Sequence, residues 1–158
     1  MAEVVLNRFE QMQAAHVGTM RRLLAIRRQR RDHYGRPAFD LWGMDIEAAG
    51  AELAVAKLTG CFWNALADDP ASLPGDVGRF QVRYTHRPAG CLIVHRADPD
   101  LAPFVLVTGR LPSYTVRGQI LGREAKQQRF WREGDGRPAY FVPAEALRPL
   151  EAVEAVAA

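Results

Sequence analysis

The feature that most constrains the fold of this chain is a change of pattern at the turn Pro74-Gly75-Asp76. Between Glu3 and Tyr34 there is no proline and no glycine cluster, and apolar residues recur at three- and four-residue steps, as on one face of a helix. After the turn, apolar and polar residues alternate and β-branched residues are frequent, as in strands. The chain is therefore expected to be helical before the turn and to form a sheet after it.

Two helices are expected before the turn. The first is one long basic helix within residues 1–34, which ends at a Gly-Arg-Pro break. The second runs from about Asp45 to Thr59, with Asp45 as its N-cap and Gly60 in a C-cap position.

Most of the sheet is expected from four strands, at about Arg79–Thr85, Cys91–Arg96, Phe104–Thr108 and Tyr114–Ile120. Their short connections favour antiparallel hairpins. A helix near Arg123–Trp131, a short strand at Ala139–Val142 and a terminal helix from Pro143 follow. This order predicts an α/β fold of the α+β kind, with a central mixed sheet of about four to five strands flanked by helices.

A length of 158 residues suits a single domain, with its core in residues 45–150. The composition, 48% hydrophobic and 25% charged, is that of a folded globular protein. No apolar run reaches the roughly 18 residues of a membrane span, and the N-terminus lacks a secretory signal pattern, so a cytoplasmic protein with no membrane contact is expected. Cys61 and Cys91 lack zinc-ligand spacing and are expected to be buried structural thiols.

Arginine supplies almost all of the positive charge, since lysine occurs only at Lys57 and Lys126 and the formal net charge is +3. Arginine suits bidentate contacts to phosphate, so a nucleic-acid partner is compatible with the composition. The candidate phosphate contacts are Arg21, Arg22, Arg28, Arg31, Arg110, Arg117 and Arg123. A solvated basic helix end is the alternative for those in the first helix.

Glu52 is the first candidate for chemistry. In a helix its three- and four-residue neighbours are Ala48, Ala49, Val55 and Ala56, all small and apolar. A carboxylate in such surroundings is costly unless it is paired, solvated or bound to metal. The residue is therefore either a salt-bridge partner or a metal ligand.

Asp76 and the strand that follows it supply the other candidates. Alternation along the strand puts Phe80, Val82 and Tyr84 on an apolar face and Gln81 and Arg83 on the other. Asp76 precedes the strand in a turn, where an aspartate is most often a turn former. We expect Gln81, Arg83 and Asp76 to converge with Glu52.

This arrangement resembles the active site of the PD-(D/E)XK nuclease superfamily. The likeness rests on the helical Glu52 in Gly50-Ala51-Glu52-Leu53-Ala54-Val55-Ala56-Lys57, then Asp76 after a Gly/Pro turn, then Gln81-Val82-Arg83 on the following strand. The chain looks most like small phage-type members, with a restriction-endonuclease-like fold. The resemblance implies that Glu52, Asp76 and Gln81 hold Mg²⁺ or Mn²⁺, and that Arg83 assists hydrolysis of a DNA phosphodiester.

Two departures from the family pattern bear on catalysis. Gln81 stands where the family has an acidic ligand, and a neutral amide brings no charge to a metal. Arg83 stands where the family has lysine; it keeps the positive charge but cannot act as a base.

Two functions are therefore expected. The first is a Mg²⁺-dependent DNA nuclease. The second is a non-catalytic protein on the same fold that binds DNA or a phage or bacterial protein. A homo-oligomer is also possible. The tryptophans are expected to be core or lid aromatics, with base stacking as the alternative, at Trp42, Trp63 and Trp131.

Overall fold

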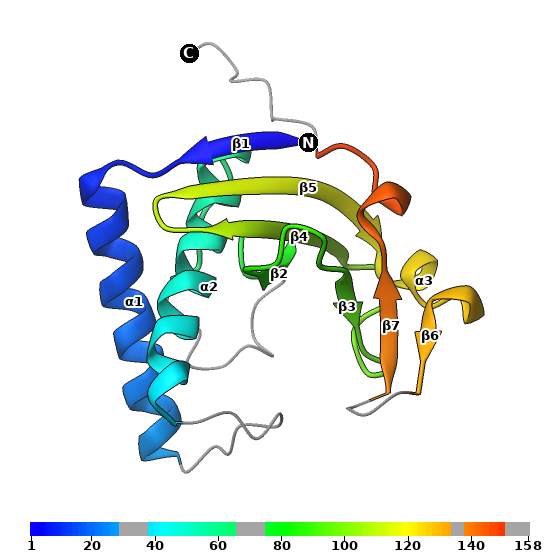
Figure 1. The fold of residues 1–158 in the computed structure, drawn as a ribbon, viewed down its shortest axis with the longest axis horizontal. Coiled ribbons are helices and arrows are strands. Elements are labelled where there is room, and N and C mark those ends of the chain that lie inside the picture. The colour runs from blue at the N-terminus through cyan, green and yellow to red at the C-terminus, as the bar shows by residue number, and fades with distance from the viewer. Residues whose placement is uncertain (29–37, 66–74, 134–137, 151–158) are drawn as a thin grey trace.

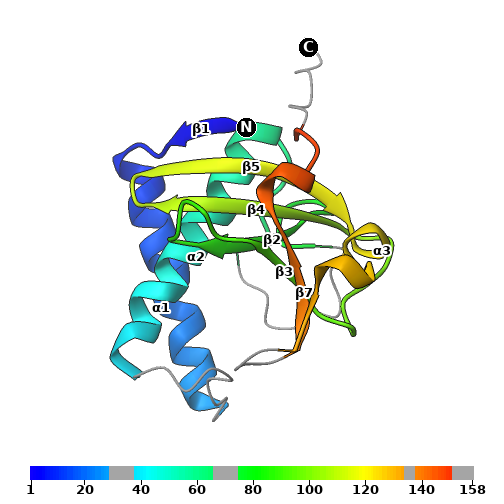
Figure 2. The same ribbon diagram turned by 45° about the vertical axis from the view of Figure 1, so that its right-hand side comes forward.

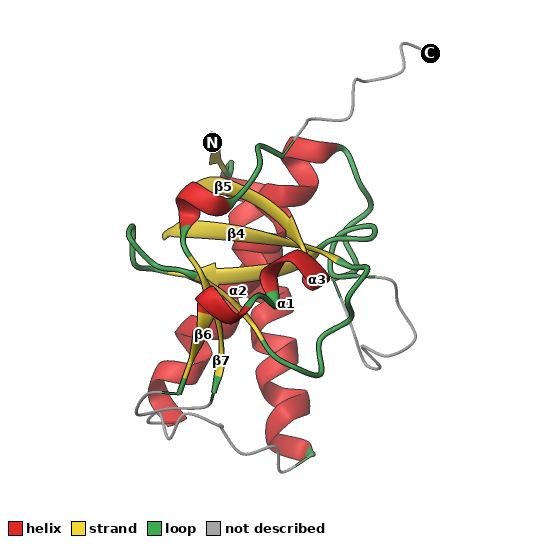
Figure 3. Cartoon of the chain, turned by 90° about the vertical axis from the view of Figure 1, so that its right-hand side faces the viewer, coloured by secondary structure: helices red, strands yellow, loops and turns green. Residues whose placement is uncertain are grey.

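The structure is a computed structural model, which describes residues 1–28, 38–65, 75–133 and 138–150. The chain has a layered α+β fold, so the predicted fold class is confirmed. Helices α1 (Arg8–Arg27) and α2 (Ala38–Thr59) cover one face of a four-stranded sheet. A smaller sheet lies toward the other face (Figure 1; the view of Figure 3 looks onto it, with the helices behind).

The four-stranded sheet is mixed. Its strands are β1 (Ala2–Val5), β2 (Gln81–Thr85), β4 (Pro103–Arg110) and β5 (Ser113–Leu121), in the order β1-β5-β4-β2. Strands β2 and β4 run parallel, whereas β4–β5 and β5–β1 are antiparallel. Helix α2 crosses the sheet close to β2 and β4 (Figure 2).

The prediction that the second expected strand forms an antiparallel hairpin with the first is wrong. The strand expected at Cys91–Arg96 is β3 (Leu92–Val94), but it forms no hairpin with β2; it pairs instead with β7 (Ala139–Val142), which also pairs with β6 (Trp131–Arg132). The far face of the main sheet carries large apolar side chains, which β3 and β7 help to bury. Burial of that face, rather than connection length, therefore decides where β3 lies.

The prediction of one long helix within residues 1–34 is also wrong. The chain begins with β1, and α1 starts only after Asn7, whose side chain accepts hydrogen bonds from the backbone of Phe9 and Glu10. The backbone N–H of Asn7 donates in turn to Oε2 of Glu10 at 2.6 Å, which completes a capping box. Because β1 pairs with β5 along its full length, the segment is extended despite its helix-like pattern. Helix α1 ends at Arg27, and residues 29–34 lie outside the described part.

Three helix boundaries differ from expectation. Helix α2 begins at Ala38, so Asp45 lies inside it and not at its N-cap, although its end at Thr59 and the positive φ of Gly60, 67°, agree with prediction. The helix expected at 123–131 is a short α3 (Gly122–Ala125) and a 3₁₀ turn, because the chain turns extended between them. After Pro143 only a 3₁₀ turn, Ala144–Ala146, is formed, and residues 151–158 lie outside the described chain.

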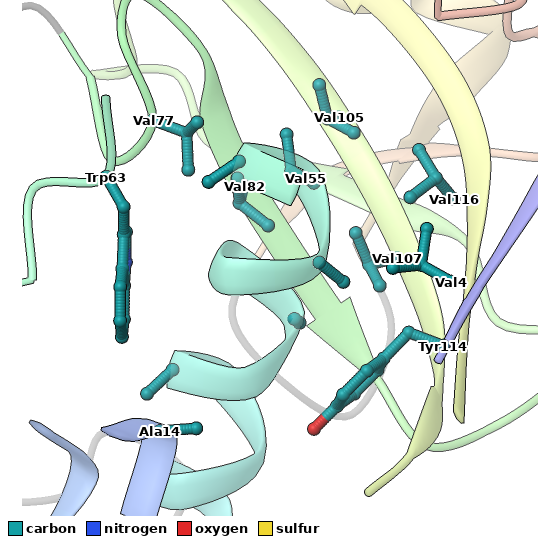
Figure 4. Close-up of a cluster of buried hydrophobic side chains, with 14 of the residues drawn as sticks. Val4, Ala14, Val55, Trp63, Val77, Val82, Val105, Val107, Tyr114 and Val116 are labelled. Atoms are coloured by element: carbon teal, nitrogen blue, oxygen red, sulfur yellow. The ribbon is translucent and has the colours of Figure 1, made fainter. Parts of the chain in front are cut away.

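The two faces of the main sheet bury separate apolar clusters. The helix-side cluster contains Val55 of α2, Val82 of β2 and Val107 of β4, with Trp63 and Tyr114 at its edges (Figure 4). The cluster on the far face contains Phe104 and Leu106 of β4 with residues of the second sheet. Phe80, Val82 and Tyr84 contact the helix-side cluster, as their alternation predicts. Both cysteines are free thiols that are half-buried rather than fully buried.

Helix α1 lies very close to α2 at one point. A Cβ added to Gly18 would stand 2.4 Å from the Cα of Ile46, so only glycine fits there. This approach sets α1 against α2 one turn before Arg21 and Arg22, and therefore brings both arginines onto α2.

Candidate functional site

Glu52 is an interior residue of α2. The residue is only 7% exposed, and its neighbours include the buried small residues Ala49 and Ala56. An ionised carboxylate in this position needs partners that replace water.

Arg21 of α1 is that partner. Its Nη1 donates to Oε1 of Glu52 and its Nη2 donates to Oε2, each at 2.7 Å, in the parallel fork typical of arginine–carboxylate pairs. The indole Nε1 of Trp63 donates to Oε2 as well, at 2.9 Å. Of the two alternatives that the sequence allows, the structure shows the salt bridge.

Asp76 lies near this pair. Burial raises the pKa of the Glu52 carboxyl; the hydrogen bond and charge of Arg21 oppose that shift, and the negative charge of Asp76 adds to it. The same Asp76 charge helps to raise the pKa of Arg21, against the effect of burial. The charge of Asp76 therefore acts on both members of the pair.

Asp76 also organises the start of β2. Its backbone N–H donates to the carbonyl of Phe80 at 2.8 Å, and its Oδ2 accepts from the N–H of Val82 at 2.7 Å. The carboxylate thus closes the turn before the strand, which is the turn-forming role that an aspartate after glycine favours.

Gln81 and Arg83 do not join the Glu52 side of the sheet. They alternate with Val82, which faces α2, and they are registered with Phe104 and Leu106 on the far face. The Cζ of Arg83 lies 5.0 Å from the Phe104 ring centroid, and its Nη2 pairs with Asp98 at 3.2 Å. The expectation that Arg83 converges with Glu52 is wrong because α2 packs on the same face as Val82.

The residues present do not fit the divalent cation that the resembled family holds. Both oxygens of Glu52 accept from a guanidinium, so a metal ion would have to displace Arg21 or lie beside its charge. Gln81 is neutral, and its side chain belongs to the other face. Within the described ranges, no three His, Cys, Asp or Glu side chains gather in a way that could hold a metal ion.

The predicted phosphate contacts do not share one environment. Arg21 and Arg22 are in ion pairs, since Arg22 binds Asp45 at 2.6 Å. Arg28, Arg110 and Arg123 are exposed. Arg117 is half-buried, with an Nε that has no hydrogen-bond partner among the described residues, and Arg31 lies outside them.

The Arg21–Glu52 pairing is the feature that sequence reasoning missed. The sequence makes Arg21 a candidate phosphate contact because it belongs to a basic run, and it leaves Glu52 as a salt-bridge partner or a metal ligand without naming the partner. The available signal was their complementarity: one buried acid and one helical arginine, each needing a partner, one turn from a glycine that lets two helices touch.

Comparisons with known proteins give no relative: no family model, no curated protein and no solved structure matches this chain. In the described part of the chain, none of the helices has the length and apolar character needed to cross a membrane.

Proposed function

We propose that this chain is a non-catalytic DNA-binding protein, in which an arginine takes the position that a metal ion would have in the nucleases it resembles. The observation that carries this proposal is the bidentate contact of Arg21 with Glu52 at 2.7 Å. A buried, hydrogen-bonded ion pair of this kind is costly to break from one side, because the remaining charge stays desolvated. The pair therefore favours a structural role for Glu52.

The exposed arginines support a polyanionic partner. Arg132 of β6 and Arg129 of the 3₁₀ turn before it are exposed. The Cζ of Arg96 lies 4.5 Å from the ring centroid of Trp131. The Trp131 ring in turn lies 4.8 Å from that of Tyr140. Arginines grouped with aromatic rings suit contacts to a nucleic-acid strand, by phosphate pairing and base stacking.

Salt dependence of DNA binding tests this proposal. Each phosphate contact should contribute about −0.9 to the slope of log affinity against log salt for duplex DNA, so Arg129→Ala with Arg132→Ala should flatten the slope. Arg148→Ala is the matched control, because Arg148 is an exposed arginine already paired with Glu124. Absence of binding at low salt would contradict the proposal and favour a protein partner. So would a slope that the double change at Arg129 and Arg132 leaves intact.

A Mg²⁺-dependent nuclease is the second candidate, and the electrostatic interaction of Asp76 with Glu52 favours it. It requires Arg21 to leave Glu52 when metal binds. Calorimetric titration with Mn²⁺ separates the two candidates: the nuclease predicts binding by the wild type that Glu52→Gln and Asp76→Asn each abolish. Arg21→Met should then tighten metal binding, because it removes the competing cation.

A further inference from the structure

A cavity of about 970 Å³ lies away from the Glu52 site, at the carboxyl ends of two parallel strands. Thr85 ends β2 and Arg110 ends β4, and both line the cavity together with Trp42 and Glu47 of α2. The carboxyl ends of parallel strands are the edge of a sheet at which open α/β folds bind ligands. The volume is that of a small-molecule site.

One polar group of the cavity is a fixed carboxylate, that of Glu47. Oε2 of Glu47 accepts from the phenol of Tyr114 at 2.8 Å and from the backbone N–H of Leu111 at 3.0 Å. Burial, with the nearby Glu47 charge, raises the pKa of Tyr84 to about 12, so this second phenol stays protonated and donates to the Gly109 carbonyl at 3.0 Å. A carboxylate can accept about four hydrogen bonds in all, which leaves Glu47 able to accept more from a ligand.

The lining combines apolar surface with charged side chains. Trp42, Tyr84 and Ile93 supply aromatic and aliphatic surface. Arg87 and Arg110 are exposed and supply two cations, and Asp40 and His86 are exposed in the same lining. The cavity therefore offers carboxylate acceptors, flat apolar surface and two guanidinium groups.

We propose that this cavity binds a nucleotide, with the base inside against Trp42 and Tyr84 and the phosphate at Arg87 and Arg110. An amino group on the edge of the base would donate to Glu47, as carboxylates accept from the amino group of cytosine in nucleic-acid complexes. The inference goes beyond the DNA surface proposed above and uses none of its residues.

Other ligand classes match this set of groups less well. An organic acid could pair with the arginines, but it would bring a like charge toward Glu47 in a partly desolvated site. A simple amine could pair with Glu47 or Asp40, but it would leave both arginines without an anion. A nucleotide carries donors on its base, a flat apolar body and an anion, so it offers a complementary group to Glu47, to the aromatic surface and to the arginines.

Titration of free deoxynucleoside monophosphates, followed by calorimetry and tryptophan fluorescence, tests the proposal directly. The monophosphates of guanine, cytosine and adenine should bind more tightly than that of thymine, which has no amino group. A nucleoside without phosphate should lose more than about tenfold in affinity, because it cannot form charge-assisted hydrogen bonds to arginine.

Three variants locate the binding. Trp42→Leu and the double change Arg87→Ala with Arg110→Ala should each weaken binding by more than about tenfold. Arg148→Ala should leave it unchanged, because Arg148 is an exposed arginine that does not line the cavity. Glu47→Gln keeps an acceptor for Tyr114 but should reduce the preference over thymine. Circular dichroism confirms that each variant is folded.

A second arm with short single-stranded oligonucleotides distinguishes a free nucleotide from one carried by a strand. Binding of oligonucleotides alone, lost in Trp42→Leu, assigns the cavity to a base extruded from a strand. Failure of both ligand types to bind, or binding that neither Trp42→Leu nor the arginine pair weakens, overturns the proposal. Neither outcome depends on the slope change expected for Arg129 and Arg132, so the two proposals can fail separately.

Discussion

Two acidic side chains of helix α2, Glu52 and Glu47, are held in different ways. Both carboxylate oxygens of Glu52 accept hydrogen bonds from the guanidinium of Arg21, and Oε2 also accepts one from the indole N–H of Trp63. Glu47 is held on one oxygen by neutral donors and borders a cavity. The difference shows that isolation among apolar residues does not by itself indicate a functional acid: the partner decides whether the carboxylate has acceptor capacity left.

The strongest way to break this comparison is to remove the cation from Glu52. Arg21→Met should cost about 3–5 kcal/mol of unfolding free energy at neutral pH, because the carboxylate stays buried without a partner. The double variant Arg21→Met with Glu52→Met should recover much of that loss, and urea unfolding of the four proteins of the cycle measures the coupling. Additive losses from the two single changes would contradict the structural role of the pair.

The same variant has a predictable pH dependence. Burial already raises the pKa of Glu52 above its ordinary 4.5, and loss of Arg21 removes the main opposing interaction. A carboxyl group whose folded-state pKa exceeds its unfolded value destabilises the fold when it is ionised. The deficit of Arg21→Met should therefore be greatest above the folded pKa and should shrink as the pH falls toward 4.5.

Substitution of Glu47 should lower the free energy of unfolding by less than substitution of Arg21. Glu47→Ala removes an acceptor from the buried phenol of Tyr114 and from the Leu111 N–H, at a cost of about 1–3 kcal/mol. Glu47→Gln should cost less, since its amide oxygen still accepts. In a Tyr114→Phe background the loss from Glu47→Ala should decrease, and equal losses in both backgrounds would show that the phenol contact contributes nothing.

Substitution of Lys57 should lower the free energy of unfolding least. Its Nζ binds Glu10 at 2.8 Å and the Val5 carbonyl at 3.0 Å, and the Lys57 hydrogen bond lowers the pKa of Glu10. That contribution is present above the ordinary pKa of 4.5 and is lost as the pH falls through the lowered folded value. Lys57→Met should cost under about 1 kcal/mol, because the pair is partly solvated. Its thermal unfolding should differ from that of Lys57→Arg near neutral pH and converge with it in acid.

Much of the sheet could be predicted from sequence, because alternation reports directly which side chains share a face. Phe80, Val82 and Tyr84 lie on the core face as expected, and the strand at Ala139–Val142 has the expected bounds. What alternation could not supply was which layer covers each face. Since α2 covers the Val82 face, Gln81 and Arg83 were assigned to the wrong partner surface.

The prediction for the N-terminus was wrong for a related reason. The pairing of β1 with β5 is a long-range contact that local patterns do not predict, and it overrides the helical spacing of the first residues. The capping box of Asn7 and Glu10 was a local signal that marked the true start of α1. Charge partners are likewise long-range: Arg21 and Glu52 meet only because Gly18 lets the helices approach.

The most direct test of the central claim is incubation of the wild-type protein with end-labelled linear, nicked and branched DNA, in parallel with Mg²⁺ and with a chelator. The account predicts intact DNA in both conditions and salt-sensitive binding that does not depend on the metal. Cleavage that requires Mg²⁺ and disappears in Glu52→Gln would show instead that Arg21 yields its position to a metal ion, and would contradict the account.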